Sequence, residues 1–344
     1  MEGLKCQIKP GTQVLLTGAT GFTGSWLAHK LLGAGLAVRA IARESSDLRP
    51  FKSLSIEWIR GALYDPEVVT AATKGVEYIF NVAGAFRQAK IEDAEYFRVH
   101  VVATQLLARA AALNPSFKRF VHVSTMGVHG HIKNPPADEN SPFAAGDQYQ
   151  RTKLEGELWL HDFARRNSLG YTVIRPTGIY GPGDRRLLKV FKMATWPLCP
   201  ILGYGKCLYH LVHVDDLTNV LMLSAVHPEA QGEVFLVGDA EAIPLAEMVK
   251  IISASIGGHT RIVRLPVLPF FAAGALCEWV CKPFGIEPPI YRRRVAFFTK
   301  DRSFNTSKMR DKLGYKPRYS TRSGLESTAA WYIENGWLKP PRKY

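Results

Sequence analysis

Cysteine is scarce in this 344-residue chain, and the cysteines present are poorly placed for metal binding or disulfide formation. The five are Cys6, Cys199, Cys207, Cys277 and Cys281. Their number is odd and their spacing is not that of a zinc ribbon. Cys277 and Cys281 would lie one helical turn apart, but no second ligand pair accompanies them. We therefore predict reduced thiols, a cytoplasmic location and no metal site.

Long hydrophobic runs are also missing. The first residues, MEGLKCQIKPGTQ, are polar and lack the apolar core of a signal peptide. The longest strongly apolar run, residues 265–277, contains prolines at 266 and 269 and is too short to span a bilayer. The sequence therefore predicts a protein that is soluble or bound to a membrane only at its surface.

Acidic residues are too few to balance the basic ones. Lys and Arg number 44, Asp and Glu number 30, and the net charge is +14. A solvated basic surface explains this most simply, although bound phosphate groups or an acidic membrane surface would also suit it. Nothing resembles a nucleic-acid-binding module, and Arg292-Arg293-Arg294 is too short to indicate one, so we expect no nucleic-acid partner.

The first half of the chain alternates short apolar runs with stretches of helical spacing. The predicted strands are residues 13–17, 37–42, 57–60, 78–82, 120–123 and 171–174. The predicted helices between them include residues 25–32, 99–113 and 149–166. This alternation is typical of an α/β fold with a Rossmann-like, doubly wound parallel sheet.

The pattern changes after Arg175. Prolines and glycines cluster over residues 176–183, and the regular alternation of strands and helices ends. We predict a Rossmann domain made of residues 12–180 and 211–239. Residues 181–210 and 240–344 would form a smaller, partly discontinuous C-terminal domain that binds the substrate.

A glycine-rich turn connects the first predicted strand to the first predicted helix. It reads Thr17-Gly18-Ala19-Thr20-Gly21-Phe22-Thr23-Gly24, with the spacing G-x-x-G-x-x-G. Glycine here lets the backbone approach a pyrophosphate, and the start of the helix supplies N–H donors. The strand before the turn and the helix after it favour this role over that of a plain turn. The predicted NAD(P)-binding residues of the turn are Gly18, Thr20, Gly21, Phe22, Thr23 and Gly24.

The end of the second predicted strand bears on which dinucleotide binds. An acidic residue there would accept hydrogen bonds from the ribose 2′-hydroxyl, whereas a basic residue would pair with a 2′-phosphate. The strand ends without an acid and Arg43 follows it, which favours NADP over NAD. Arg43 could instead be a solvated strand-end charge, and Glu44 could reach the ribose.

Two later segments supply candidate proton-transfer groups. Tyr149 and Lys153 are four residues apart on one face of a predicted helix, and Ser124-Thr125 follow the fifth predicted strand. A free tyrosine has a pKa near 10, which a nearby ammonium group would lower. Tyr149 would then exchange a proton with an alcohol or ketone, and Lys153 would also hold the nicotinamide ribose. A hydroxyl of Thr125 or Ser124 would bond the substrate oxygen.

Each of these residues, taken singly, could be ordinary helix or turn structure. Together with the glycine-rich turn they resemble the extended short-chain dehydrogenase/reductase family, also called the NAD-dependent epimerase/dehydratase group. The matching segments are Thr17 to Gly24, Asn81-Val82-Ala83-Gly84, Val123 to Gly130, the Tyr149/Lys153 pair, Arg175 to Asp184 and His213-Val214-Asp215-Asp216. The resemblance runs from about residue 12 to 340. It implies NAD(P), a Rossmann-like sheet and a C-terminal substrate lid.

The resemblance also assigns roles to residues outside the glycine-rich turn. The further candidates for lining the cofactor are Ala62, Leu63, Val82, Ala83, Gly84, Pro176 and Ile179. Asp215 and Asp216 would cap a helix at the domain junction. The long helices of this family form a dimer, so the resemblance implies a homodimer.

Two positions depart from the family pattern. Thr125 replaces the usual serine, which keeps the hydroxyl and adds a methyl group. Tyr209 stands where members that act on sugar nucleotides carry an arginine for the diphosphate, which argues against such a substrate, although Arg185, Arg186, Lys189 or Lys192 could substitute for it. The remaining similarity is nearest the 3β-hydroxysteroid dehydrogenase-like and dihydroflavonol reductase-like branches, and a hopanoid-associated epimerase branch is also similar over residues 311–317.

We therefore expect an NAD(P)-dependent oxidoreductase that acts on a secondary alcohol or ketone of an apolar, ring-bearing small molecule. A 3β-hydroxysteroid or related terpenoid is the best candidate, with Phe86, Trp196 and Tyr209 as candidate substrate contacts. Residues 265–284 could form a lid helix, and residues 265–294 could rest on a membrane. The alternatives are a nucleotide-sugar epimerase or dehydratase that retains its cofactor, and a non-catalytic NADP-sensing scaffold.

Overall fold

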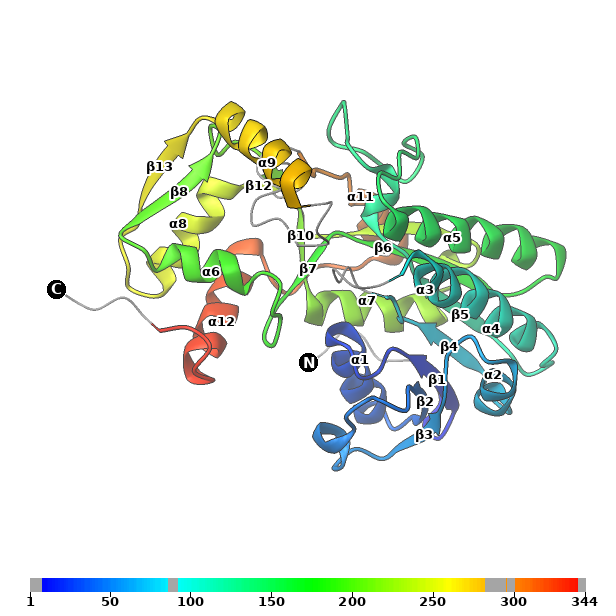
Figure 1. Ribbon diagram of the computed structural model, residues 1–344. Helices are drawn as coiled ribbons and strands as arrows, with labels where there is room; N and C mark the ends of the chain where they lie inside the picture. Colours follow the sequence, from blue (N-terminus) through cyan, green and yellow to red (C-terminus); the bar gives the residue numbers. More distant parts are fainter. Residues whose placement is uncertain (1–7, 86–91, 282–294, 296–300, 340–344) are drawn as a thin grey trace.

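The computed structural model describes residues 8–85, 92–281, 295 and 301–339, and a seven-stranded parallel sheet forms its centre (Figure 1). The strands are β1 (Gln13–Thr17), β2 (Ala37–Ala42), β3 (Ile56–Arg60), β4 (Tyr78–Asn81), β5 (Arg119–Val123), β6 (Tyr171–Pro176) and β11 (Val234–Val237). They lie in the order β11-β6-β5-β4-β1-β2-β3, so the direction of winding reverses at β1. This order is that of a doubly wound Rossmann-like sheet and confirms the predicted fold class.

Helices cover both faces of the sheet, because alternate side chains of each strand point to opposite faces. One face carries α1 (Phe22–Gly33), α7 (Val214–Val226) and α11 (Ser307–Leu313). The other carries α2 (Pro66–Thr73), α4 (Ala103–Ala112) and α5 (Gln148–Arg166). Within β1, Val14 and Leu16 pack into the first apolar cluster and Leu15, between them, packs into the second.

The six predicted strands all form, and their ends move by at most two residues. The predicted helix over residues 99–113 is interrupted. It consists of α3 (Asp93–Phe97), a π-helical turn Arg98–Val102, and α4. At the π turn α5 comes very close, because a Cβ on Gly156 would lie 2.3 Å from the carbonyl oxygen of His100. A π turn inserts one residue into a helix and often lies at a functional site.

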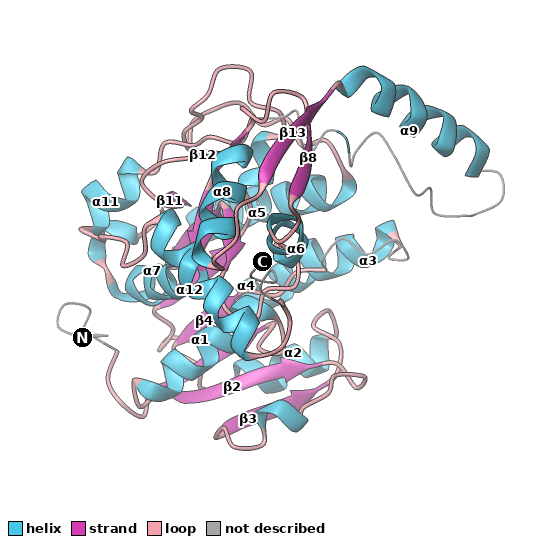
Figure 2. Cartoon of the chain, turned by 90° about the vertical axis from the view of Figure 1, so that its left-hand side faces the viewer, coloured by secondary structure: helices cyan, strands magenta, loops and turns pink. Residues whose placement is uncertain are grey.

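A second lobe lies beside the sheet (Figures 1 and 2). Its elements are α6 (Leu188–Ala194), β8 (Leu198–Leu202), β9 (Leu208–Tyr209), β12 (Ile243–Pro244), α8 (Leu245–Ser255), β13 (Arg261–Leu265), α9 (Val267–Cys281) and α12 (Thr321–Glu334). Its core includes Phe191, Met248, Ile252, Leu325 and Tyr332. The parallel pair β7 (Gly178–Tyr180) and β10 (Leu211–His213) lies where the chain passes between the lobes. The domain boundaries given above stay a prediction.

Of the predicted lid helix over residues 265–284, the structure describes α9 (Val267–Cys281), and residues 282–284 lie outside the described residues. Its role as a lid stays a prediction. Figure 2 shows α9 projecting from the rest of the molecule. Among the residues that the structure describes, no helix combines the length and the hydrophobicity needed to cross a bilayer.

Candidate active site

The glycine-rich turn lies between the end of β1 and the start of α1. Gly18 has a φ of 72°, and a Cβ there would lie 2.8 Å from the Cα of Ala83. A Cβ on Gly24 would lie 2.0 Å from the carbonyl oxygen of Gly18. Both positions therefore require glycine, which lets the first turn of α1 pack directly on the loop.

The start of α1 fits the pyrophosphate of a dinucleotide. Its N-cap is Gly21, which has no side chain to satisfy the first N–H groups, and no acidic residue lies in the first turn. The N–H groups and the positive end of the helix dipole are therefore available to an anion. Thr20 and Gly21 are exposed, and Phe22 and Thr23 are partly exposed in the same turn. The predicted phosphate-binding residues are thus brought together.

The segment after β4 is hydrogen-bonded to this turn. Thr17 donates from Oγ1 to Oδ1 of Asn81 at 2.8 Å, and the N–H of Ala83 donates to Oγ1 of Thr17 at 3.1 Å. Val82 and Ala83 are half-buried and Gly84 is exposed. The predicted cofactor-lining segment therefore lies next to the glycine-rich turn and is partly open to a ligand.

Lys153 extends from α5 to the ends of two strands. Its Nζ donates to the carbonyl oxygen of Ala83 at 3.2 Å and to that of Val123 at 2.9 Å. Burial lowers the pKa of Lys153 to about 8, and the negative charge of Glu157 opposes this shift. The ammonium form still predominates at neutral pH. Its positive charge lies beside Gly84, where a Cβ would be 3.5 Å from Nζ.

Tyr149 lies in the first turn of α5, on the same face as Lys153. Asp147 caps this helix and accepts a hydrogen bond from the N–H of Gln150 at 2.9 Å. The ring of Tyr149 is half-buried and lies edge-on to the ring of His100, with 5.2 Å between centroids. The structure therefore brings the predicted tyrosine and lysine together at the edge of the cofactor-lining segment.

His100 is a site residue that the sequence pattern does not reveal. It belongs to the π-helical turn, and its Nε2 accepts a hydrogen bond from the N–H of Ala85 at 3.1 Å. Its Nδ1 therefore carries the proton, and lies 2.8 Å from Oγ1 of Thr152 in α5. Burial, and then the charge of Lys153, lowers the pKa of His100 to about 2, so the ring is neutral. A single histidine on an amphipathic helix is usually a core residue. His100 is distinguished by its position in the π-helical turn, which the sequence pattern does not reveal.

Ser124 and Thr125 have different surroundings. Ser124 is buried and donates its hydroxyl to the carboxylate of Glu157. Thr125 is half-buried, and its Oγ1 accepts from the N–H of Gly127 at 3.0 Å. Gly127 lies close to Gln150, the residue after Tyr149, because a Cβ on it would be 3.1 Å from that side chain. Thr125 therefore lies near the start of α5 with its O–H as a donor, whereas the proton of Ser124 is committed to Glu157.

A buried ion pair lies behind these residues. Nη2 of Arg175 is 2.5 Å from Oε1 of Glu157, and the two side chains are 2% and 0% exposed. Arg175 also donates to the carbonyl oxygen of Glu139 at 2.9 Å and contacts Nε2 of His129 at 3.1 Å. Burial would raise the pKa of Glu157, but hydrogen bonds from His161 and Arg175 lower it to about 2. The arginine of the Arg-Pro motif therefore fixes α5 against β6.

Arg43 is exposed just beyond the end of β2, with Glu44 exposed next to it. Its carbonyl oxygen accepts a hydrogen bond from Nη1 of Arg60 at 2.8 Å. Arg60 is the last residue of β3, so two guanidinium groups come from neighbouring strand ends. Ala62 and Leu63 follow it and are half-buried. The preference for NADP over NAD stays a prediction.

Pro176 and Ile179 lie where the sheet leads into the second lobe. Pro176 ends β6 and is buried, and Ile179 is half-buried in β7, where it pairs with Val212 of β10. Their contact with the cofactor stays a prediction.

Two of the three predicted substrate contacts, Tyr209 and Trp196, lie in the described part of the second lobe. Tyr209 is buried in the core of the second lobe, and the guanidinium carbon of Arg302 lies 5.1 Å from its ring centroid. Trp196 is 48% exposed on the same lobe. Phe86 lies outside the described residues. Because Tyr209 is buried, its side chain is part of the core of the second lobe and does not line an open substrate site.

The His-Val-Asp-Asp segment differs from the prediction that its two aspartates cap a helix. The N-cap of α7 is His213, whose ring accepts from the N–H of Asp215 at 3.3 Å. Asp215 instead pairs with Lys30 of α1 at 2.8 Å. Asp216 accepts from the N–H of Arg318 at 2.8 Å, which ties α7 to the chain that enters the second lobe. The aspartates lie inside the first turn of α7, two and three residues after the N-cap, and their side chains bind neighbouring segments.

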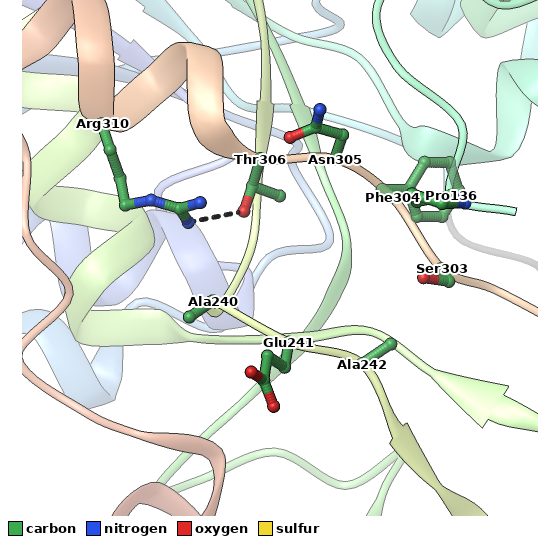
Figure 3. Close-up of a pocket in the computed structure, with 9 residues that line it drawn as sticks. All are labelled: Pro136, Ala240, Glu241, Ala242, Ser303, Phe304, Asn305, Thr306 and Arg310. Carbon is green, nitrogen blue, oxygen red and sulfur yellow. Dashed lines mark hydrogen bonds between the residues drawn. The ribbon is translucent and has the colours of Figure 1, made fainter.

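A cavity of about 340 Å³ lies at another place, between the segment after β11 and residues 303–306 (Figure 3). Its lining residues are Pro136, Ala240, Glu241, Ala242, Ser303, Phe304, Asn305, Thr306 and Arg310. Arg310 is turned toward Thr306 and donates to its hydroxyl at 3.0 Å. None of these lining residues belongs to the group around Tyr149, so this cavity is not the predicted active site.

The fold and these residues define a class of protein: an NAD(P)-dependent enzyme built on a Rossmann-like sheet, with a tyrosine and a lysine on one helix face. The chain belongs to the NAD dependent epimerase/dehydratase family, whose sequence pattern matches residues 14–238. It is therefore an enzyme of the extended short-chain dehydrogenase/reductase type, and the predicted family is confirmed.

Several relatives match nearly the whole chain. The sterol demethylase protein B of Methylococcus capsulatus is 28% identical, over 94% of this chain and 99% of the relative. The 3 beta-hydroxysteroid dehydrogenase/Delta 5-->4-isomerase of Mycobacterium tuberculosis is 28% identical, over 93% of this chain and 90% of the relative. The solved structure of the epimerase Mth375 from Methanothermobacter thermautotrophicus has a TM-score of 0.77 at 27% identity, covering 96% of this chain and 95% of that one.

Proposed function

We propose that this enzyme is an oxidoreductase that transfers a hydride between a nicotinamide cofactor and a secondary alcohol or ketone of an apolar, ring-bearing substrate. A 3β-hydroxysteroid or related terpenoid is the proposed substrate class. The observation that carries the proposal is the hydrogen bond from Lys153 to the carbonyl oxygen of Ala83, on a helix whose first turn carries Tyr149 and starts near Thr125. The names of the two sterol-related relatives support the substrate class.

The residues of the chain account for the proton in this reaction. When bound, the nicotinamide ring supplies or accepts the hydride. Tyr149 gives a proton to the substrate oxygen in reduction and takes it in oxidation. Lys153, held by the carbonyl groups of Ala83 and Val123, supplies the positive charge that favours a tyrosine phenolate. The hydroxyl of Thr125 donates to the same substrate oxygen and stabilises its developing charge.

Replacing Tyr149 by Phe tests this mechanism. The variant keeps the ring contact with His100 and loses the proton, so kcat should fall by about a hundredfold or more while the dissociation constant of the cofactor changes little. The assay follows nicotinamide absorbance over a panel of sterols, aromatic ketones and nucleotide sugars, with NAD and NADP in parallel. Full activity of the variant would refute the assignment of Tyr149.

The same panel tests the cofactor preference. We propose that Arg43 pairs with the 2′-phosphate of NADP, because it is exposed at the end of β2 and no acid ends that strand. Arg43→Ala should then weaken NADP binding and leave NAD binding nearly unchanged. An equal loss for both dinucleotides would contradict this role.

We also propose that the enzyme is a homodimer, as the resemblance to its family implies. The molar mass in solution, measured for the full chain, tests this proposal.

One observation favours the nucleotide-sugar alternative. Arg302 lies against Tyr209, the position at which sugar-nucleotide enzymes carry an arginine, and could supply a positive charge there. In that case the cofactor would be regenerated in each cycle. Conversion of a nucleotide sugar without net change in nicotinamide absorbance would establish this alternative, and Arg302→Ala would then raise KM. Net oxidation or reduction of a sterol would exclude it.

A further inference from the structure

The second lobe carries most of the large exposed hydrophobic side chains in the described part of the protein. Twelve such side chains are at least 36% exposed, and eight of them fall between residues 196 and 280. The eight are Trp196, Leu198, Tyr204, Val263, Leu268, Leu276, Trp279 and Val280. Soluble monomers seldom expose apolar side chains in such a concentration unless the surface binds something.

Two neighbouring elements form this surface. β8 and β13 pair in parallel, with Leu198 opposite Arg261 and Pro200 opposite Val263, and all four residues are exposed. Cys199, between Leu198 and Pro200, is buried in the core of the lobe. The pair of strands therefore has one face on the core and one face open, and the open face is largely apolar.

Helix α9 follows β13 directly and extends the same surface. Of its fifteen residues, Gly274 is the buried one, while Leu268, Leu276 and Trp279 are 82%, 61% and 76% exposed. Glu278 is the one charged residue of this helix. Figure 2 shows the helix standing away from the rest of the molecule. A helix that is apolar on all sides is stable only when something covers it.

The charge around this surface indicates what covers it. Residues 185–214 contain Arg185, Arg186, Lys189, Lys192 and Lys206 and no acidic residue. Residues 248–277 contain Lys250, Arg261 and Arg264 and again no acidic residue. Arg186 pairs with Asp184 and lies over the ring of Phe22 in α1, so it serves another part of the molecule. Arg261 and Arg264 of β13 are exposed within this surface, and Lys206 is exposed just after β8. An apolar surface with basic neighbours suits the interface of an anionic lipid bilayer.

We propose that the open face of β8 and β13, together with α9, docks on an anionic lipid surface. We call this set of residues, 196–204 and 261–281, the docking surface. Trp279 and Leu276 enter the interface, while Arg261, on the open face of β13, meets the lipid headgroups. Docking would give the enzyme its apolar substrate directly from the bilayer, and this part of the inference rests on the proposed function.

Sedimentation with vesicles tests the docking, and it needs no substrate. The full chain is mixed with vesicles of phosphatidylcholine alone or with added phosphatidylglycerol. We expect binding to the anionic vesicles, weaker binding to the neutral ones, and loss of binding as salt rises. The double variant Leu276→Glu/Trp279→Glu should bind at least about tenfold more weakly. Leu113→Glu, at an 85% exposed site next to α4, is the matched control and should bind like the unaltered protein.

Three results would overturn the proposal. These are absence of binding to anionic vesicles, equal binding by the Glu double variant, and a dimer whose formation depends on Leu276 and Trp279. The third result would mean that a second copy of the chain covers the docking surface. Thermal unfolding of each variant checks that the fold is intact. Vesicle binding is measured without turnover. Failure to oxidise or reduce a sterol would therefore leave the docking proposal intact, and failure to bind vesicles would leave the proposed sterol activity intact.

Discussion

His100 contacts three parts of the active site, two through its ring nitrogens and one through a contact between rings. Nε2 accepts from the N–H of Ala85, the residue directly after the cofactor-lining segment, and Nδ1 contacts Thr152 in α5. Its ring also forms one wall around Tyr149. With its pKa lowered by burial to about 2, it holds no mobile proton near neutral pH. We therefore regard His100 as a positioning residue that fixes Tyr149 relative to the cofactor.

Replacement of His100 by Ala should lower kcat about tenfold, because the N–H of Ala85 loses its acceptor and the ring of Tyr149 loses its neighbour. His100→Asn keeps a polar group in the π turn and should recover part of the loss. Steady-state kinetics over a pH range measures both variants. If His100 only positions other groups, KM for the substrate stays close to normal and the pH profile keeps its shape. A lost acidic limb in the profile would instead show that His100 transfers a proton.

At the scale of single elements, the β1–α1 turn depends on the absence of a side chain. A Cβ on Gly24 would lie 2.0 Å from the carbonyl oxygen of Gly18, and backbone at that distance must move. Gly24→Ala should therefore shift the start of α1 away from the pyrophosphate position. We expect cofactor affinity to fall by about tenfold or more, and the free energy of unfolding to fall by about 1–3 kcal/mol. Nicotinamide fluorescence and thermal unfolding measure the two effects.

The same helix supplies the control for this change. Gly33 is the last residue of α1, and a Cβ on it would have no neighbour within 4 Å. Gly33→Ala should leave cofactor binding unchanged and should be neutral or stabilising by up to about 1 kcal/mol, since alanine favours helix more than glycine does. Equal cofactor affinity in the Gly24 and Gly33 variants would show that the close approach at Gly24 does not matter for binding.

The elements also show what the sequence could and could not predict. Strands such as β1 and β2 were predictable because their apolar runs end at glycine or charged residues. The Tyr149/Lys153 pair was predictable because helical spacing alone puts both on one face. The π turn was not, because its side chains continue the apolar pattern of α4 and the extra residue depends on the approach of Gly156. The pairing of β8 with β13 joins segments about sixty residues apart and leaves no local signal.

At the scale of the whole molecule, two aspartates join the sheet to the second lobe. Asp216 of α7 accepts from the N–H groups of Arg318 and Tyr319, and Asp239, just after β11, accepts from the hydroxyl of Thr321 at the start of α12. The backbone oxygen of Asp239 also accepts from His210 at 2.8 Å. Buried carboxyl groups therefore help to fix the position of the second lobe on the sheet.

Asp239 makes the free energy of unfolding depend on pH. Burial first, and then the charge of Asp216, raises its pKa from 3.8 to about 7, although the hydrogen bond from Thr321 acts the other way. Its Oδ1 is buried without a hydrogen-bond partner among the described residues, so the ionised form is poorly stabilised. The folded protein therefore holds the proton more tightly than the unfolded chain. It follows that the free energy of unfolding falls as pH rises from about 4 through about 7.

Asp239→Asn removes this titration while keeping an oxygen that can accept from Thr321. Relative to the variant, the unaltered protein should lose about 2 kcal/mol of stability between about pH 5 and pH 8, as measured by denaturant unfolding at each pH. Asp138→Asn is the control. The hydrogen bond from Ser141 lowers the pKa of Asp138, so its titration lies below this range and the difference should stay flat. A constant difference for Asp239→Asn as well would mean that Asp239 is already ionised at pH 5, and that the junction between the lobes does not respond to pH through this residue.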